Sequence, residues 1–282
     1  MLVNLSEILK IAEKENKAIG MFNATGFDSL QAIIKAAEEL NEPVILGHAE
    51  CHNVFNDISM VGPAMIAAAN AAKVPVCVHL DHGVTMEMID RAIEIGFTSI
   101  MIDASALPYE ENVKMTLEVV KKCHAKNISV EAELGCLATS ESGEIKSNDP
   151  KEFYTKPDQA KCFVESTGID ALAIAFGTAH GFYKSTPVLD FDVIKNVRKV
   201  VNVPLVMHGG SGVSHEDYKK VIEAGIRKIN YYSYMSKAGY MAAKEIIDSN
   251  KTSYLHDVEF AAMNAMKEDA LKTIKVFANK ND

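Results

Sequence analysis

The sequence predicts a (β/α)8 barrel, the TIM-barrel fold, with one additional helix at the C-terminus. Eight short apolar segments rich in β-branched residues recur along the chain, as expected for buried parallel strands. A segment whose apolar residues have helical spacing follows each of them. Because this alternation fills 282 residues without a linker or low-complexity tract, we expect a single barrel domain over residues 1–282.

The expected strands are apolar almost throughout and are bounded by turn residues, the pattern of strands covered on both faces. An open doubly wound sheet is the alternative, but no glycine-rich dinucleotide-binding turn follows the first strand. In chain order the eight segments span residues 18–24, 43–50, 75–83, 98–105, 128–135, 170–177, 203–210 and 227–233.

The expected helices carry their apolar residues three and four positions apart, so that one face can cover the strands. The first 17 residues are an amphipathic polar start without a signal-peptide pattern. In chain order the helical segments span residues 28–40, 61–73, 85–96, 110–127, 156–168, 190–201, 214–225 and 234–249, followed by a tail helix near 257–278.

The composition excludes several classes of protein. A net charge of −9 argues against a broad nucleic-acid surface, and no stretch approaches the apolar length of a membrane span. The five cysteines are scattered and form no CxxC pair, so neither a disulfide framework nor a thiolate zinc site is expected. A reducing, cytoplasmic setting fits best.

Polar residues gather where the expected strands end. In a (β/α)8 barrel the C-terminal ends of the strands form the active-site rim, so these side chains should face one shared cavity. In strand order they are Asn23; His48, Glu50 and His52; His79, Asp81 and His82; Asp103 and Ser105; Glu131 and Glu133; His180; His208; Asn230 and Ser233.

Three different ends supply one candidate metal ligand each: His82, His180 and His208. Three imidazoles with one open position are a common catalytic zinc arrangement, and the acidic residues nearby favour a metal over three unrelated histidines. Strict alternation would place Asp81 and His82 on opposite faces of the strand. We therefore expect the chain to bend out of the strand at Gly83.

The stretch HGGSG, residues 208–212, closes the seventh strand and precedes the helix 214–225. Glycines allow successive backbone amides to point inward, and a helix N-terminus favours an anion. Phosphate often binds near strands 7 and 8 of such barrels. An ordinary tight turn is the alternative.

Six motifs occur in an order that resembles the class II, zinc-dependent ketose-bisphosphate aldolases, a family that includes the fructose- and tagatose-bisphosphate enzymes. The resemblance runs from about Asn23 to Ser233. It implies a (β/α)8 barrel that reversibly cleaves a ketose 1,6-bisphosphate to dihydroxyacetone phosphate and an aldehyde through an enediolate, as in glycolysis. The motifs are HLDHG (79–83), IMIDAS (100–105), VEAELG (130–135), GTAHGFY (177–183), LVMHGGSG (205–212) and KIN (228–230).

The resemblance also implies roles for individual residues. His82, His180 and His208 would hold the zinc, Asp81 would exchange a proton with an oxygen of the aldehyde portion, and Glu141 would move the proton of the triose. Asp103 and Glu133 match acidic positions linked to a second cation, divalent or monovalent. The substrate-binding candidates are Asn23, Gly181, Lys184, Gly209, Gly210, Ser211, Asn230, Tyr231, Tyr232 and Ser233.

Several departures from the family pattern concern the substrate. Ala49 stands where many members have serine, Tyr231 and Tyr232 are bulky, and the tail lacks the arginine that often binds the far phosphate. A ketose 1-phosphate with an unphosphorylated aldehyde portion is therefore an alternative. An isomerase or epimerase reaction and a sugar-phosphate sensor are others. The roles of His48 and His52 stay open between a substrate contact and an extra metal site.

The partners that the resemblance implies are a small sugar phosphate and further copies of the chain. We expect a homodimer or homotetramer, in which the last helix packs on a neighbouring chain. Lysine-based chemistry is disfavoured because no lysine falls at the C-terminal end of an expected strand.

Overall fold

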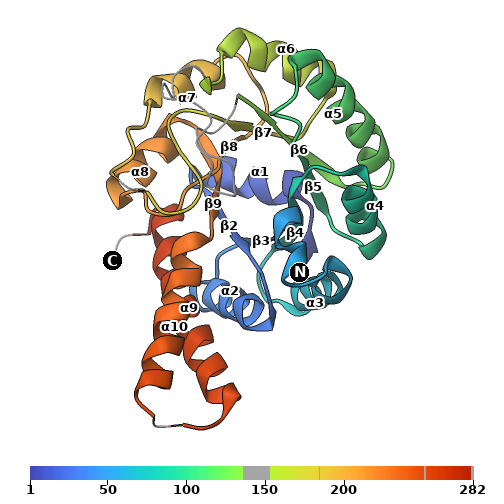
Figure 1. Ribbon diagram of the computed structural model, residues 1–282. Helices are drawn as coiled ribbons and strands as arrows, with labels where there is room; N and C mark the ends of the chain where they lie inside the picture. The colour runs from blue at the N-terminus through green and yellow to red at the C-terminus, as the bar shows by residue number, and fades with distance from the viewer. Residues whose placement is uncertain (136–152, 184, 251, 281–282) are drawn as a thin grey trace.

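The structure, a computed structural model, describes residues 1–135, 153–183, 185–250 and 252–280. Eight parallel strands form a closed barrel, since β4 pairs with both β3 and β5 at the two ends of the strand order. Figure 1 shows the helices around this ring. The barrel strands are β2 (Ile19–Asn23), β3 (Val44–Ala49), β4 (Val76–Gly83), β5 (Ser99–Ile102), β6 (Ser129–Leu134), β7 (Ala171–Ile174), β8 (Leu205–Met207) and β9 (Ile226–Tyr231).

The predicted (β/α)8 architecture with an extra C-terminal helix is confirmed. Every barrel strand falls within its predicted segment except β9, which begins one residue earlier, at Ile226. A short strand, β1 (Leu2–Val3), was not predicted; it pairs with the first residues of β4, before the pairing of β4 with β5 begins at His79.

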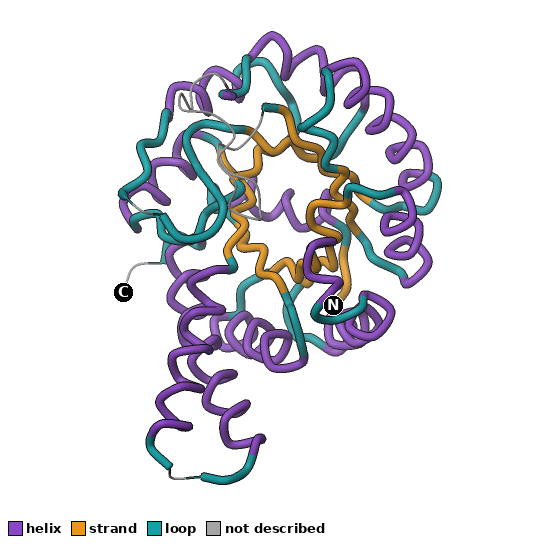
Figure 2. The backbone as a smooth tube through the Cα atoms, viewed as in Figure 1, coloured by secondary structure: helices purple, strands orange, loops and turns teal. Residues whose placement is uncertain are grey.

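The helices lie outside the barrel (Figure 2). They cover the outward-facing apolar side chains of the strands. Among the described residues, none of the helices combines the length and the apolarity that a membrane span requires. The helices are α2 (Phe27–Leu40), α3 (Ile58–Ala71), α4 (Met86–Ile95), α5 (Tyr109–His124), α6 (Pro157–Thr167), α7 (Phe191–Arg198), α8 (His215–Ala224), α9 (Ser233–Asp248) and α10 (Leu255–Phe277), together with a short 3-10 helix, η1 (Glu50–Val54).

One helix, α1 (Leu5–Glu15), closes the end of the barrel where the strands begin (Figure 1). Its N-terminus is capped by Asn4 and Glu7, whose side chains bond each other's backbone amides. Its fully buried Leu5, Ile8 and Leu9 pack against inward-facing strand residues. The sequence of this segment predicted only an amphipathic start. Since α1 fills this end, the polar groups at the strands' C-terminal ends lie at the opposite, open end.

Helices α9 and α10 form a hairpin that projects from the barrel wall (Figure 1). Helix α10 packs against both α9 and α2. The hairpin also carries large apolar side chains that are exposed in the single chain: Tyr240, Met241, Ile247, Leu255 and Phe260. These exposed groups lie on both helices, outside the hydrophobic core.

Candidate active site

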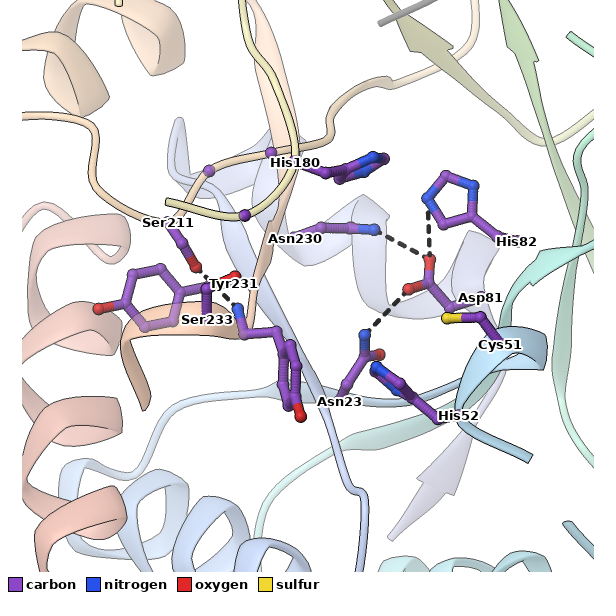
Figure 3. A pocket seen from close by; sticks show the side chains of 14 residues that line it. Asn23, Cys51, His52, Asp81, His82, His180, Ser211, Asn230, Tyr231 and Ser233 are labelled. Atoms are coloured by element: carbon purple, nitrogen blue, oxygen red, sulfur yellow. Dashed lines mark hydrogen bonds and ion pairs between the residues drawn. The ribbon is translucent and has the colours of Figure 1, made fainter. Parts of the chain in front are cut away.

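A pocket opens where the C-terminal ends of the strands meet, and most of the predicted site residues line it (Figure 3). Its walls come from β2, η1, β4, β9 and the segments that follow β7, β8 and β9. The described lining residues are Asn23, Cys51, His52, Asp81, His82, His180, Gly181, Gly209, Gly210, Ser211, Asn230, Tyr231, Tyr232 and Ser233.

A break in β4 turns two consecutive side chains toward this pocket. The pairing of β4 with β5 shifts register between Leu80 and Gly83, and His82 adopts the left-handed conformation with φ of 45°. That conformation is uncommon for a residue with a side chain and marks a bulge. The predicted bend at Gly83 was therefore wrong by one residue. Gly83 is instead tightly packed, because a Cβ there would lie 2.7 Å from the carbonyl oxygen of Met101.

The bulge brings His82 beside His180 and His208. The ring centroid of His82 is 5.0 Å from that of His180 and 4.5 Å from that of His208. One nitrogen of each ring lies within 4.8 Å of the others, so the three could share one metal ion. Burial lowers the pKa of His208 and brings that of His180 well below its usual value, which leaves both rings in the neutral, metal-binding form at pH 7.

Hydrogen bonds fix which nitrogens of two of these rings face each other. Nδ1 of His82 lies 2.7 Å from Oδ2 of Asp103, and Nε2 of His208 lies 2.9 Å from Oε1 of Glu131. A carboxylate only accepts, so both of these nitrogens carry the proton. The opposite nitrogens, Nε2 of His82 and Nδ1 of His208, are 2.8 Å apart, a hydrogen-bond distance. If both rings are neutral, their two lone pairs meet here and a shared proton or cation satisfies them; the third imidazole favours a metal ion.

The two carboxylates that orient these rings are ionised. Burial by itself would raise the pKa of Asp103, but hydrogen bonds from His82 and Ser105 outweigh it and lower the pKa. Burial would likewise raise the pKa of Glu131, whereas the charge of Lys228 and the hydrogen bond from His208 lower it to about 2. Such outer partners set the tautomer of a metal-binding histidine.

A second group of ligand atoms overlaps the first. Atoms of His82, Asp103 and Glu133 lie within 4.8 Å of one another. Oδ1 of Asp103 also accepts hydrogen bonds from the backbone and the hydroxyl of Ser105, at 3.1 and 2.7 Å. The predicted second-cation residues are thus adjacent in space.

Asp81 is held by an amide group on each side (Figure 3). Nδ2 of Asn23 donates to Oδ2 at 3.2 Å, and Nδ2 of Asn230 donates to Oδ1 at 3.0 Å. Burial would raise the pKa of Asp81, but electrostatic interactions with His82, with His208 and with the Lys228 ammonium outweigh it and lower the pKa below its usual value. An oriented, ionised carboxylate beside the histidines is suited to accept a proton.

Glycines form the opposite side of the pocket. Gly181 and Gly209 have φ of 84° and 64°, and a Cβ on Gly209 would lie 2.4 Å from the carbonyl oxygen of Ala179. The hydroxyl of Tyr183 joins the two glycine segments, because it accepts from the amide of Ala179 and donates to the carbonyl of Gly209. Helix α9 begins beside them at Ser233, so its N-terminus adds to a region suited to an anion.

The remaining wall comes from η1. Cys51 and His52 face the pocket on the side away from Ser211 and Ser233 (Figure 3), and the ring of His52 lies 4.8 Å from that of Tyr232. Glu50 fixes η1, since its carboxylate accepts hydrogen bonds from the amides of Val84 and Thr85.

A match to a known family accompanies this geometry. The family model for class II fructose-bisphosphate aldolase matches residues 3–282. The chain belongs to this family. This class II aldolase is therefore a carbon–carbon lyase, as the motifs predicted, and class II aldolases are in general zinc-dependent.

Relatives agree with the assignment. YdjI of Escherichia coli K12, described as uncharacterized, is 42% identical over 271 residues, covering 95% of this aldolase and 94% of YdjI. The crystal structure of the YdjI aldolase matches with a TM-score of 0.88 and 40% identity, over 98% of this chain and 97% of that one. A candidate fructose-1,6-bisphosphate aldolase from Coccidioides immitis matches with a TM-score of 0.87 and 29% identity, over 99% and 97%. Fructose-bisphosphate aldolase from Campylobacter jejuni, 23% identical over 99% and 97%, shares the fold with a TM-score of 0.80.

Some predictions of the aldolase site are not met or not tested. Glu141 and Lys184 lie outside the described residues, so their roles stay predictions. His48 is fully buried on the face of β3 that it shares with Leu46, toward the helices, and neither it nor His52 belongs to a candidate metal group among the described residues. Tyr231 borders the pocket but also packs edge-on against the ring of Phe22, at 5.7 Å.

Sequence reasoning missed two residues of this site and the role of a third. Cys51 lines the pocket, and Lys228 lies fully buried beneath it beside Glu131, which was expected at the rim. Glu131 was recognised only as a polar strand residue, and Lys228 sits within β9 rather than at its end. A charged residue inside an otherwise apolar strand was the available signal, because such a group needs a buried partner.

Proposed function

We propose that this class II aldolase is zinc-dependent and reversibly cleaves a ketose 1-phosphate into dihydroxyacetone phosphate and an aldehyde. One observation carries the proposal. The outer nitrogens of His82 and His208 face carboxylates, and their inner nitrogens lie 2.8 Å apart with a nitrogen of His180 within 4.8 Å, so that neutral rings would direct their lone pairs at one shared cation. Three neutral imidazoles match the ligand set of a catalytic zinc ion.

The three histidines would hold the ion, and bound zinc would supply a Lewis acid that polarises the substrate carbonyl. The protein supplies the proton transfer. Asp81, oriented by Asn23 and Asn230, takes the proton of the hydroxyl on the carbon beyond the breaking bond. That hydroxyl becomes the aldehyde carbonyl as the carbon–carbon bond breaks. In the reverse direction Asp81 returns the proton to the same oxygen.

The carbon left electron-rich by bond cleavage must gain a proton to become dihydroxyacetone phosphate. Glu141 remains the proposed donor, on the resemblance alone. The phosphate of the triose half would lie against Gly181, Gly209, Ser211 and Ser233, where the glycines and the start of α9 favour an anion.

The far end of the substrate would lie near Asn23, Cys51 and His52. Among the described residues that line the pocket, none is a lysine or an arginine. A second phosphate is usually bound by such cationic side chains. This supports a substrate with one phosphate over the ketose 1,6-bisphosphate that the resemblance implies.

The experiment is a product analysis with matched substrates. The zinc-loaded protein is incubated with fructose 1-phosphate, fructose 1,6-bisphosphate and tagatose 1,6-bisphosphate, and in reverse with dihydroxyacetone phosphate and aldehydes with or without a phosphate. We expect carbon–carbon bond cleavage and formation, fastest with a single phosphate. Faster cleavage of a bisphosphate would reject the single-phosphate assignment. Isomerised or epimerised products, or binding without turnover, would reject the aldol reaction.

We also propose that the chain forms a homodimer or homotetramer and works in the cytoplasm. Exposed Tyr240, Met241 and Phe260 on the α9–α10 hairpin support self-association, since apolar groups of this size are usually covered. Sedimentation velocity should give a mass of two or four chains. Tyr240→Lys combined with Phe260→Lys should lower it, and a monomeric unmodified protein would contradict the proposal.

A further inference from the structure

An ion pair lies directly beneath the three histidines, inside the barrel. Glu131 on β6 and Lys228 on β9 are both fully buried, and Nζ of Lys228 lies 2.8 Å from Oε2 and 3.0 Å from Oε1 of Glu131. Removing two charges from water is costly, and an apolar pair of similar size often serves stability as well or better. Stability alone therefore does not explain this buried ion pair, whereas its contacts with residues of the site indicate a role.

The pair has a contact in each direction. Oε1 of Glu131 lies 2.9 Å from Nε2 of His208, the nitrogen that faces away from the metal site. Nζ of Lys228 donates to Oδ1 of Asn230 at 2.8 Å, and Nδ2 of Asn230 donates to Oδ1 of Asp81 at 3.0 Å. A continuous series of hydrogen bonds thus joins a metal-site histidine to the proposed proton acceptor.

From this geometry we infer that Lys228 and Glu131 are positioning residues, which together set the tautomer of His208 and the orientation of the Asn230 amide against Asp81. The inference rests on the proposed function, because it takes the three histidines as zinc ligands and Asp81 as the proton acceptor. Neither residue touches the pocket itself, and both would act through the groups that do.

The direction of each bond follows from the donors and acceptors. An ammonium group has three donors and no acceptor, so Asn230 must turn its oxygen toward Lys228 and its NH2 toward Asp81. A carboxylate has no donor, so His208 must carry its proton on Nε2, which leaves the Nδ1 lone pair for a metal. The Lys228 ammonium lies within 3.0 Å of both oxygens of Glu131, so donors approach this carboxylate from two sides. The ion pair thus fixes both the orientation of the Asn230 amide and the tautomer of His208.

Two substitutions separate the two branches. Glu131→Gln gives the carboxamide a donor, so His208 can take the other tautomer with a proton on Nδ1. We expect zinc affinity, measured by competition with a chromophoric chelator, to fall about 10–100-fold. Lys228→Met frees the Asn230 amide to rotate. We expect kcat at saturating zinc to fall by at least about 10-fold, with KM changing much less.

A matched control is available at the other end of the barrel. Lys17 and Glu42 form another buried lysine–glutamate pair, with no residue of the pocket in contact. Lys17→Met should lower the thermal unfolding midpoint in the same way as Lys228→Met, while zinc affinity and kcat stay within about 2-fold. Loss of stability alone in the Glu131 and Lys228 variants, as in this control, would overturn the inference.

Two further precautions keep the test decisive. If Lys228→Met does not fold because Glu131 is left unpaired, the double variant Lys228→Met with Glu131→Gln removes both charges and should show both defects. Zinc affinity is measured without substrate. A protein that binds zinc but cleaves no ketose phosphate would therefore reject the proposed reaction, while the His208 branch is still decided by Glu131→Gln. Unchanged zinc affinity in that variant rejects this branch.

Discussion

At the scale of the residue, hydrogen bonds restrict the orientations and tautomers that the side chains of the site can adopt. Asp81 is held by two amides, His82 by Asp103 and His208 by Glu131. Each partner is buried or half-buried, so water does not compete freely for these bonds. The reacting groups are therefore positioned before a substrate arrives, which is the condition for efficient proton transfer.

Replacing Asp81 tests the proposed base. Asp81→Asn retains the shape of the side chain but cannot accept the hydroxyl proton as a carboxylate does, so kcat should fall about 10²–10⁴-fold. Zinc content, measured by elemental analysis, should stay unchanged because Asp81 is not one of the three proposed zinc ligands. Asp90→Asn serves as the control, since Asp90 pairs with Lys122 at the surface, and full turnover in Asp81→Asn would refute the role.

The three histidines were predictable because each ends or follows an apolar strand, and barrel topology brings such positions together. The Lys228–Glu131 pair was not predictable in the same way. These residues are 97 positions apart along the chain, and they meet only because β6 and β9 face each other across the closed barrel. Nothing in the local sequence of either strand specifies the partner of the other.

At the scale of the element, β4 contributes most to the site through its irregularity. The left-handed His82 departs from strand geometry, and a residue in that conformation stores backbone strain. Propensity and alternation describe regular strands, so they placed the strand correctly and the bend one residue too late. Helix α1 escaped prediction for a related reason, because its four buried residues have meaning only against the barrel end that they close.

Gly83 tests the importance of the bulge. In Gly83→Ala the new Cβ would lie 2.7 Å from the carbonyl oxygen of Met101 and 2.8 Å from Cδ2 of Leu80, so β4 must shift. We expect a loss of about 1–3 kcal/mol in the free energy of unfolding. Zinc affinity should also fall as His82 moves.

The matched control for this substitution is Gly26→Ala. A Cβ at Gly26 would meet only Nδ2 of Asn56, at an ordinary 3.6 Å. Urea unfolding and chelator competition on both variants separate a general glycine effect from one on β4. Equal behaviour of the two variants would show that the bulge tolerates a side chain.

At the scale of the whole molecule, metal and fold should be linked. Zinc held by His82, His180 and His208 would join β4 to the segments after β7 and β8, so its removal should loosen the barrel. Dialysis against EDTA should abolish turnover and lower the thermal unfolding midpoint, and zinc should restore both. At free zinc 1,000-fold above Kd the stabilisation would be about 4 kcal/mol.

Zinc-saturated EDTA is the control for that experiment. Treatment with borohydride in the presence of substrate tests the opposite mechanism, since it traps a lysine adduct. Inactivation by borohydride but not by EDTA would exclude the zinc mechanism.

Stability should also fall below neutral pH, because buried histidines cannot take up protons. Burial lowers the pKa of His48 to about 4 and that of His79 to about 3, against 6.5 when exposed. As the pH falls below about 6.5, the unfolded chain binds protons that the folded chain does not. Each such histidine then reduces the free energy of unfolding by about 1.4 kcal/mol per pH unit.

His48→Leu should flatten this dependence between pH 6.5 and 5, as followed by urea unfolding. His256→Leu, which removes a histidine at an exposed position, is the matched control. A slope unaltered by the loss of His48 would show that the ring is protonated in the folded protein.

The single-domain organisation expected from the even strand spacing stays a prediction.

Helix α9 spans two environments. Its first residue, Ser233, lies in the wall of the pocket, and its sixteen residues extend about 24 Å outward into the hairpin with its exposed apolar side chains. A continuous helix couples the position of its first residue to that of its last. A neighbouring subunit packed on the hairpin would restrict the motion of α9 and thereby of Ser233 beside the bound triose. Substrate affinity should therefore increase with chain concentration, as the subunits assemble.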